Sequence, residues 1–390
     1  MTKSRLWVSH TEAVLCIMFM LILIGTVNVF SASFVKAGME YNNTYYFLNR
    51  HLMSLAIGFV GMILTIKFDY KRWRRMVPFI LLATIAALVA VDIVGVEING
   101  SRRWLNIGMQ FQPSELAKLT TILFMAAYLG PRIDKQAKIS MFTKQMGIIA
   151  VMGLLVYRQP DLGTAAIIVG IAFFLHILAG MHKEEAILLS LLALTVAVAL
   201  TFSASYRAER VWAWFDPWAY QGDKGYQTVQ SMIAIGSGGF FGEGLGMGTS
   251  KFYYLPEAHT DFAFAILCQE MGFIGAIGVF VLLAALAFYS GKIARQAQDG
   301  FGKMLVIGIT ILVVGQGIAN IAMVSGVLPV IGVPLPFISY GGTSLMINMA
   351  AVGILVNVGR QSAKKQVPGP NGGEKIAAPK RTFKLMRKGA

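Results

Sequence analysis

Charged residues are scarce in this chain of 390 residues. They make up 14% of it, whereas hydrophobic residues make up 56%. A soluble domain carries about 25% charged residues, so the composition excludes an ordinary soluble globular protein. Apolar runs of about 20 residues, long enough to span a bilayer, recur along the chain. The sequence therefore predicts an all-α polytopic membrane protein.

Cysteine is also scarce. The chain has two, Cys16 and Cys268, and both fall in apolar segments without a Cys-x-x-Cys pair. This pattern argues against a disulfide framework and against a cysteine metal site. We expect both to be small buried apolar residues.

A phosphate-binding loop for nucleotides is lacking as well. Residues 236–248 read GSGGFFGEGLGMG, but the run has no Gly-Lys-Ser/Thr ending and no strand precedes it. We exclude a nucleotide cofactor here. The glycines indicate backbone that is either flexible or closely packed.

Acidic residues are outnumbered, 19 to 34, which gives a net charge of +15. The basic residues concentrate in alternate connections, such as residues 67–75 and 132–144, and in the last 31 residues. Lys and Arg are enriched on the cytoplasmic side of membrane proteins. The charge thus predicts that both termini are cytoplasmic, and no nucleic-acid partner is needed to explain it.

About ten transmembrane helices are expected. They cover residues 13–33, 51–67, 77–95, 114–130, 145–157, 162–180, 186–204, 262–290, 303–326 and 341–359. The fifth is short, so we expect it to be tilted, broken or re-entrant. One large extracytoplasmic loop, at about 205–260, separates helices 7 and 8.

The chain divides into three parts on this reading. Residues 1–12 form a cytoplasmic N-terminus, residues 13–360 form the transmembrane domain, and residues 361–390 form a basic cytoplasmic tail. The tail is too poor in apolar residues to fold, so we expect it to be disordered. It either attracts anionic membrane lipid or a partner, or only keeps the chain oriented.

The first candidate site is YLPEAHTDF at residues 254–262, which ends the polar loop. Glu257, His259 and Asp261 gather there at the membrane boundary. Ionisable groups at that depth indicate a functional site by default. For Asp261 two readings stay open, because Asp is also a preferred capping residue at a helix start.

The second candidate combines NGSRRWLN at 99–106 with QPSELAKL at 112–119. Glu115 and Lys118 are spaced i,i+3 and share one helix face. Two charges inside a membrane must pair or face a polar cavity. They form either a structural ion pair or, with Arg103, a cationic pocket for a phosphate-bearing substrate.

Two breaks in the apolar pattern complete the set. QPDLGT at 159–164 places Asp161 where it would cap the sixth helix. PVIGVPLPFISYGGTS at 329–344, which includes Ser339, has three prolines and three glycines and cannot form a continuous helix. Irregular backbone at membrane depth must face protein or a wet cavity, so we expect this segment to wall the cavity of Asp261.

These segments together resemble the signature of the SEDS family, which contains FtsW, RodA and SpoVE. The resemblance covers about residues 10–360, in order, and rests on the motifs at 101–104, 112–118, 159–164, 256–262 and 338–344. Ala258 makes the fourth motif more similar to the FtsW branch, which acts in cell division.

The resemblance implies a peptidoglycan glycosyltransferase that polymerises lipid II at the outer face of the bacterial cytoplasmic membrane, for septal wall synthesis. Lipid II is an undecaprenyl-pyrophosphate disaccharide-pentapeptide. The partners implied are a class B penicillin-binding protein, which supplies the transpeptidase, and other division proteins. The essential aspartate of the family corresponds to Asp261. Its helix carboxylate and lysine correspond to Glu115 and Lys118, and its loop arginine to Arg103.

The chemistry of these residues fits that reaction. Asp261 would be the general base for the acceptor hydroxyl, with a pKa raised by burial. Cations stabilise a leaving pyrophosphate, and the candidates are Arg103, Lys118 and Arg210. A divalent cation, Mg²⁺ or Mn²⁺, is a candidate cofactor, and Glu257, His259 and Asp261 offer ligand atoms. The other residues expected at the substrate site are Glu115 and Ser339. Because no second carboxylate is placed as a nucleophile, we expect inversion at the anomeric carbon.

Three alternatives stay open. The chain could be a lipid II flippase or transporter, although a transport path needs polar groups across the whole membrane and the cytoplasmic half is largely uncharged. It could be a RodA-type polymerase for elongation. It could also be a non-catalytic scaffold, which would not need Asp261, Glu115 and Lys118 in a lipid environment.

Overall fold

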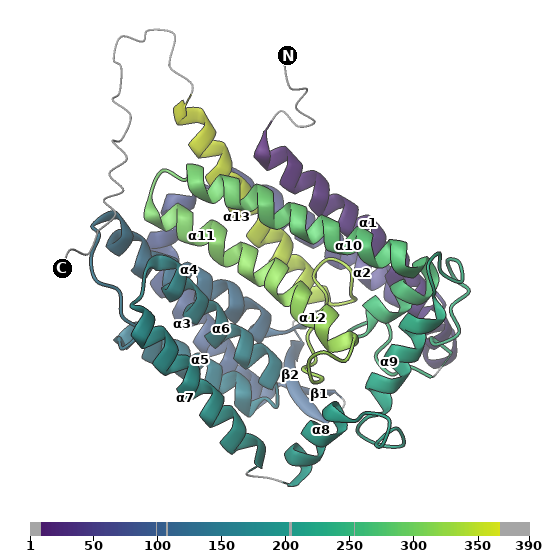
Figure 1. Cartoon of the computed structure of the whole chain (residues 1–390). Coiled ribbons are helices and arrows are strands. Elements are labelled where there is room, and N and C mark those ends of the chain that lie inside the picture. The colour runs from purple at the N-terminus through teal and green to yellow at the C-terminus, as the bar shows by residue number, and fades with distance from the viewer. Residues whose placement is uncertain (1–8, 99, 107, 203–204, 253, 367–390) are drawn as a thin grey trace, which may run out of the picture.

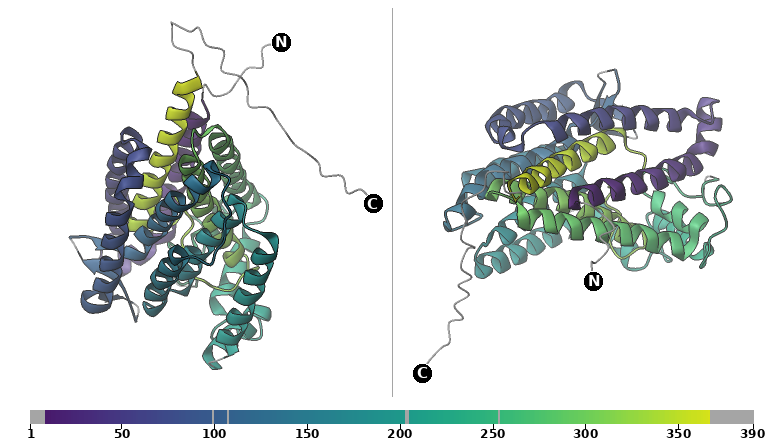
Figure 2. Two further views of the ribbon diagram at one scale, coloured as in Figure 1. Left: turned by 90° about the vertical axis from the view of Figure 1, so that its left-hand side faces the viewer. Right: turned by 90° about the horizontal axis from the view of Figure 1, so that it is seen from above.

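The computed structural model describes residues 9–366, apart from residues 99, 107, 203–204 and 253. The described part is mostly helical, and the views in Figures 1 and 2 show the long helices running side by side as one bundle. In chain order the helices are α1 (His10–Tyr41), α2 (Tyr46–Lys67), α3 (Tyr70–Val94), α4 (Pro113–Asp134), α5 (Lys144–Arg158), α6 (Leu162–Ala179), α7 (Lys183–Phe202), α8 (Ser205–Phe215), α9 (Tyr226–Ser237), α10 (Ala263–Gln296), α11 (Gly300–Thr310), α12 (Gln316–Val324) and α13 (Gly342–Gln366). A π-helical turn (Ile311–Gly315) joins α11 to α12.

Seven helical stretches of the described chain are long and apolar enough to cross a membrane. They are α1, α2, α3, α6, α10, the continuous run Gly300–Val324, and Gly342–Ala363 within α13. Each coincides with one of the ten expected segments. The other three expected segments are helices α4, α5 and α7. Helix α5 has only 15 residues, and charged side chains lie in the first turns of α4 and α7.

Helix ends lie beyond the apolar runs in several places. Helix α3 begins at Tyr70, seven residues before the expected start, because Asp69 caps it by accepting the N–H of Lys71. The basic residues that follow belong to the helix and not to a loop, since long basic side chains extend from a helix end into water. Helix α13 likewise runs to Gln366, beyond the expected helix end at 359 and into the expected tail, and the rest of that tail lies outside the described residues.

The core lies among α4, α10, α11, α12 and α13. Helix α13 packs along α2, α11 packs along α4, and α1 packs along α10. Helix α4 is buried over most of its length, whereas α2 and α3 keep many large apolar side chains exposed. The outer helices therefore present their apolar faces to lipid, and the inner helices form the wall behind the cavity described below.

A small antiparallel sheet follows α3, which the sequence reading did not anticipate. Its strands are β1 (Val96–Ile98), β2 (Ser101–Asn106) and β3 (Gln110–Phe111), in the order β1-β2-β3. Arg102 pairs with Glu97 across β1 and β2, and Leu105 pairs with Phe111 across β2 and β3. Side chains alternate between the two faces of a strand, so neighbouring Arg102 and Arg103 point to opposite sides.

The expected large loop at 205–260 contains α8 and α9, followed by the glycine-rich run. That run is closely packed at some of its glycines, whereas a Cβ on Gly236, Gly239 or Gly246 would meet no atom within 4 Å. A Cβ on Gly238 would lie 2.1 Å from the carbonyl oxygen of Cys268, and one on Gly242 would lie 2.2 Å from that of Glu270. The loop backbone thus contacts α10 directly, at the place where Gly272 (φ 64°) interrupts that helix.

A single glycine substitution tests the contact between α4 and α11. A Cβ on Gly130 would lie 2.5 Å from the main-chain nitrogen of Phe301, whereas one on Gly61 of α2 would meet no atom within 4 Å. Overpacking against main chain costs about 1–3 kcal/mol, and an alanine gains about 1 kcal/mol of helix propensity over glycine. We expect Gly130→Ala to lower the thermal midpoint of the detergent-purified chain and Gly61→Ala to keep or raise it. Equal midpoints would contradict this packing.

Candidate functional site

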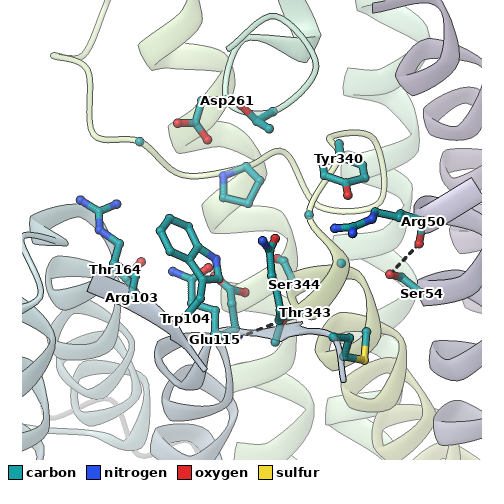
Figure 3. A pocket seen from close by; sticks show the side chains of 18 of the residues that line it. Arg50, Ser54, Arg103, Trp104, Glu115, Thr164, Asp261, Tyr340, Thr343 and Ser344 are labelled. Atoms are coloured by element: carbon teal, nitrogen blue, oxygen red, sulfur yellow. Dashed lines mark hydrogen bonds between the residues drawn. The ribbon is translucent and has the colours of Figure 1, made fainter. Parts of the chain in front are cut away.

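A cavity of about 780 Å³ opens where β2, the start of α4, the turn before α10 and the segment before α13 meet. Figure 3 shows the side chains that point into it. They come from distant parts of the sequence, and its polar lining includes Arg50, Ser54, Arg103, Trp104, Gln112, Glu115, Thr164, Glu257, Thr260, Asp261, Tyr340, Thr343 and Ser344. Four expected site residues, Arg103, Glu115, Glu257 and Asp261, thus line one cavity.

Asp261 stands in the turn before α10, and it does not cap that helix. The N-cap is Phe262, which makes no side-chain cap hydrogen bond. Within the described residues no hydrogen bond or ion pair engages the Asp261 carboxylate. The main chain is held instead, because the amide of Asn320 donates to the carbonyl of Asp261 at 2.7 Å. This hydrogen bond thus fixes the main chain of Asp261, while no hydrogen bond among the described residues holds its carboxylate.

The surroundings of Asp261 favour its protonated form. Burial is the main cause, and the negative charges of Glu257 and Asp161 add to it, while Arg103 opposes it. Together they raise the pKa of Asp261 to about 7. A carboxyl group with that pKa can accept a proton at neutral pH, as a general base must.

Arg103 is anchored by the turn before α6. Its Nε donates to the carbonyl of Gln159 at 3.1 Å, and its Nη2 donates to the carbonyl of Pro160. Within the described residues it forms no salt bridge, so its charge remains available to a ligand in the cavity. Gln159 is fixed in turn, since its amide donates to the carbonyl of Leu88 in α3.

Asp161 caps α6, as expected, by accepting the N–H of Thr164 at 3.0 Å. Its other oxygen accepts the amide of Gln112 at 3.3 Å. Burial raises the pKa of Asp161, and the charge of Arg103 works against that rise. The residue joins α6 to the start of α4 and adds a negative charge near Asp261.

Glu115 and Lys118 form a buried ion pair with an N–O distance of 2.7 Å. Lys118 also donates to Oε1 of Gln316 in α12 at 2.8 Å, and Gln316 donates to the carbonyl of Pro334. Glu115 faces the cavity, whereas Lys118 lies behind it and is only 1% exposed. The ion-pair reading thus accounts for Lys118, and the pair connects α4, α12 and the irregular segment.

His259 and Ser339 are buried beside the cavity rather than at its lining. The His259 ring packs between Phe47 and Tyr340, and burial lowers its pKa to about 4. The hydroxyl of Ser339 accepts the N–H of Leu335 at 2.9 Å and so closes a turn of the irregular segment. Both residues shape the wall of the cavity.

The remaining expected residues are Glu257 and Arg210. Glu257 adopts a left-handed backbone conformation (φ 54°), and its carboxylate accepts the hydroxyl of Thr260 at 2.7 Å. Among the described residues, no group of three or more His, Cys, Asp or Glu could hold a metal ion. Arg210 lies in α8, and its side chain is outside the described part of the structure.

Sequence reasoning missed Arg50 and Tyr340. Arg50 lies on α2, and Figure 3 shows it across the cavity from Arg103. Its guanidinium stacks over the ring of Tyr46, 4.6 Å from the centroid. The available signal was a lone arginine in the first turns of a helix, close behind the three consecutive aromatic residues 45–47.

Comparison with known proteins agrees with this architecture. A relative from Geobacter sp. (strain M18), named probable peptidoglycan glycosyltransferase FtsW, is 39% identical over 349 residues, which are 88% of this chain and 95% of the relative. Stage V sporulation protein E of Bacillus subtilis (strain 168) is 38% identical over 353 residues, 89% of this chain and 96% of the relative.

A solved structure shares the fold. It is a chain of a peptidoglycan synthase complex that coordinates polymerisation and crosslinking, with a TM-score of 0.74 and 26% identity, and the match covers 91% of this chain and 99% of that one. The family model for FtsW, RodA and SpoVE, described as cell cycle proteins, matches residues 12–364. The protein is thus a member of the FtsW/RodA/SpoVE family.

Proposed function

We propose that this protein is a peptidoglycan glycosyltransferase that polymerises lipid II, as the names of its relatives suggest. The observation that carries the proposal is Asp261, a carboxylate without a partner among the described residues, set in a cavity that also holds Arg103 and Arg50. A base and two cations in one cavity suit a reaction in which a hydroxyl loses a proton and a pyrophosphate leaves.

In the reaction, Asp261 takes the proton of the acceptor sugar's 4-hydroxyl. The oxygen attacks the anomeric carbon of the donor sugar, and the bond from that carbon to the undecaprenyl pyrophosphate breaks with its electron pair going to the phosphate oxygen. Attack opposite the leaving group inverts the anomeric carbon. The proton on Asp261 then passes to water, which restores the base.

Arg103 and Arg50 would neutralise the phosphates. Each is fixed on its own element, and charge develops on the leaving pyrophosphate in the transition state. Arg210 stays a prediction, as do His259 and Ser339 as direct substrate contacts. A divalent cation also stays a prediction: Mg²⁺ needs only one or two protein carboxylates in addition to phosphate oxygens. Asp261 and Glu257 are the two carboxylates that would hold the ion. The ion would then help the arginines to neutralise the phosphate charge.

The membrane arrangement follows the same proposal. Helices α4, α5 and α7 cross the membrane together with the seven apolar spans, which gives ten crossings and puts both termini in the cytoplasm. The cavity then opens to the extracytoplasmic side, where lipid II is polymerised. The septum is the proposed location, from the FtsW-type motif, and a class B penicillin-binding protein is the proposed partner that crosslinks the strands.

The first test replaces the base. Asp261→Asn removes the proton acceptor and keeps the size of the side chain, and general bases contribute about 10²–10⁴-fold to rate. We expect polymerisation of purified lipid II by the complex with the penicillin-binding protein to fall by about that factor. The matched control is Asp223→Asn, which changes an exposed carboxylate outside the cavity and should leave the rate unchanged.

Near-normal polymerisation by Asp261→Asn would refute the base assignment. Lipid II translocation across vesicles without any polymer from wild type would favour a transporter instead. Repeating the polymerisation assay with a chelator tests the requirement for a divalent cation, independently of the base assignment and of transport.

The second test is the pH dependence of the rate. A base works in its deprotonated form, so the rate should rise with pH through about 7, the pKa of Asp261, and level off above it. Because the charge of Arg103 lowers that pKa, Arg103→Gln should move the midpoint to higher pH at saturating lipid II. Arg102→Gln, on the exposed side of the same strand, should not move it. An unshifted midpoint in Arg103→Gln would contradict the coupling.

The third test separates structure from binding at the buried pair. Lys118→Met leaves Glu115 buried without its counter-ion, which costs about 3–5 kcal/mol, so the thermal midpoint should fall strongly. The double variant Glu115→Gln/Lys118→Met removes both charges and should recover most of the midpoint. We expect its polymerisation rate to stay low because Glu115 faces the cavity. Full recovery of activity would make the pair purely structural.

A further inference from the structure

A second cavity of about 460 Å³ lies at the other end of α3. It is lined by Lys71, Arg74, Arg75, Asp134, Asp299 and Phe301. Helix α3 begins at this cavity and leads directly into β1, the neighbour of the strand that holds Arg103. Its 25 residues rise about 37 Å. The two cavities therefore lie at opposite faces of the membrane, and the second takes no part in the chemistry proposed for the first.

Both carboxylates of this cavity accept hydrogen bonds that hold neighbouring elements together. Asp134 at the end of α4 accepts the N–H of Gly300 at 2.8 Å. Asp299 caps α11 by accepting the N–H of Gly302 at 2.7 Å, and its other oxygen accepts the hydroxyl of Tyr70 at 2.9 Å. Their negative charge thus holds the start of α11 against α3 and α4.

The three basic side chains of this cavity are not paired with its carboxylates. Within the described residues, no ion pair engages Lys71, Arg74 or Arg75, and all three are exposed. The ammonium of Lys71 donates to the side-chain oxygen of Gln298 at 3.4 Å and lies over the ring of Tyr70, 5.8 Å from its centroid. Three cations on one turn and a half of helix repel one another, so an anion in the cavity would relieve that repulsion.

The same face of α3 continues as an apolar stripe. Phe79 is four residues after Arg75 and Leu82 is three residues after Phe79, so all three share one side of the helix. Phe79 is 74% exposed and Leu82 is 69% exposed, on a helix with the composition of a membrane span. A basic pocket followed by a lipid-exposed stripe matches a molecule with a phosphate at one end and hydrocarbon at the other.

We propose that this cavity binds the phosphate of an anionic phospholipid from the adjacent leaflet, with the acyl chains lying along α3. Basic pockets between transmembrane helices on the cytoplasmic side bind such headgroups. The C-terminal residues 367–390 are an unsuitable occupant because they are themselves strongly basic. A metal cation is disfavoured by the three positive charges.

The test compares lipid affinities by native mass spectrometry of the full chain in detergent, titrated with phosphatidylglycerol or phosphatidylethanolamine. Arg74→Gln/Arg75→Gln should weaken phosphatidylglycerol binding roughly 25-fold, about fivefold for each charge removed near the membrane surface. Phosphatidylethanolamine binding should not change. Polymerisation of lipid II by the same variant, measured with its partner, should persist and would show that the variant is folded.

The matched control is Arg72→Gln/Arg295→Gln. It removes the same charge from the same membrane face. Arg72 lies 5.9 Å from the ring centroid of Phe68, Arg295 lies in the last turn of α10, and neither lines the cavity. An equal loss of phosphatidylglycerol in both double variants would reduce the effect to diffuse surface charge and overturn the site. Wild-type affinity in Arg74→Gln/Arg75→Gln would overturn it too. If inorganic phosphate competes as strongly as the lipid, the pocket is a free-anion site and the lipid assignment fails.

Discussion

Backbone that leaves the helix inside a membrane protein must find its hydrogen-bond partners within the protein. Two side chains on α12 meet that requirement here. Asn320 donates to the carbonyls of both Asp261 and Val333, and Gln316 donates to the carbonyl of Pro334. The turn that carries the candidate base and the irregular segment opposite it thus depend on the same short helix. A π-helical turn lies directly before α12, and such turns are frequent at functional sites.

A buried ion pair also holds backbone in place next to this turn. Lys251 and Glu270 are 0% and 1% exposed at their side chains and pair at 2.6 Å, and the hydroxyl of Ser31 contacts both. They join the loop before Asp261 to α10 and α1. Isolated charges at that depth would be costly, but each here is fully paired, so the network fixes one arrangement of the loop.

Short-range features of the sequence predicted the helices better than they predicted the site. Apolar runs, the cap at Asp161 and the ion pair of Glu115 with Lys118 are short-range features, and periodicity or spacing is enough to find them. The small sheet after α3 was missed because NGSRRWLN has no run of alternating apolar residues. Arg50 was missed because its role comes from tertiary packing that sets α2 across from β2. For the same reason, the sequence could not show that the ring of His259 packs against Phe47 while its neighbours in the motif line the cavity.

The size of the candidate cavity has a consequence for what the proposed polymerase can recognise. Its volume, about 780 Å³, lies in the range that encloses one drug-sized ligand. Two lipid-linked disaccharide-pentapeptides are far larger, so most of each molecule must stay outside, the chains in lipid and the peptides in water. Selection then acts on the sugars and phosphates next to the new bond. On the proposed function, the stem peptide then lies outside this cavity, and peptides of different composition need no matching change in the residues that line it.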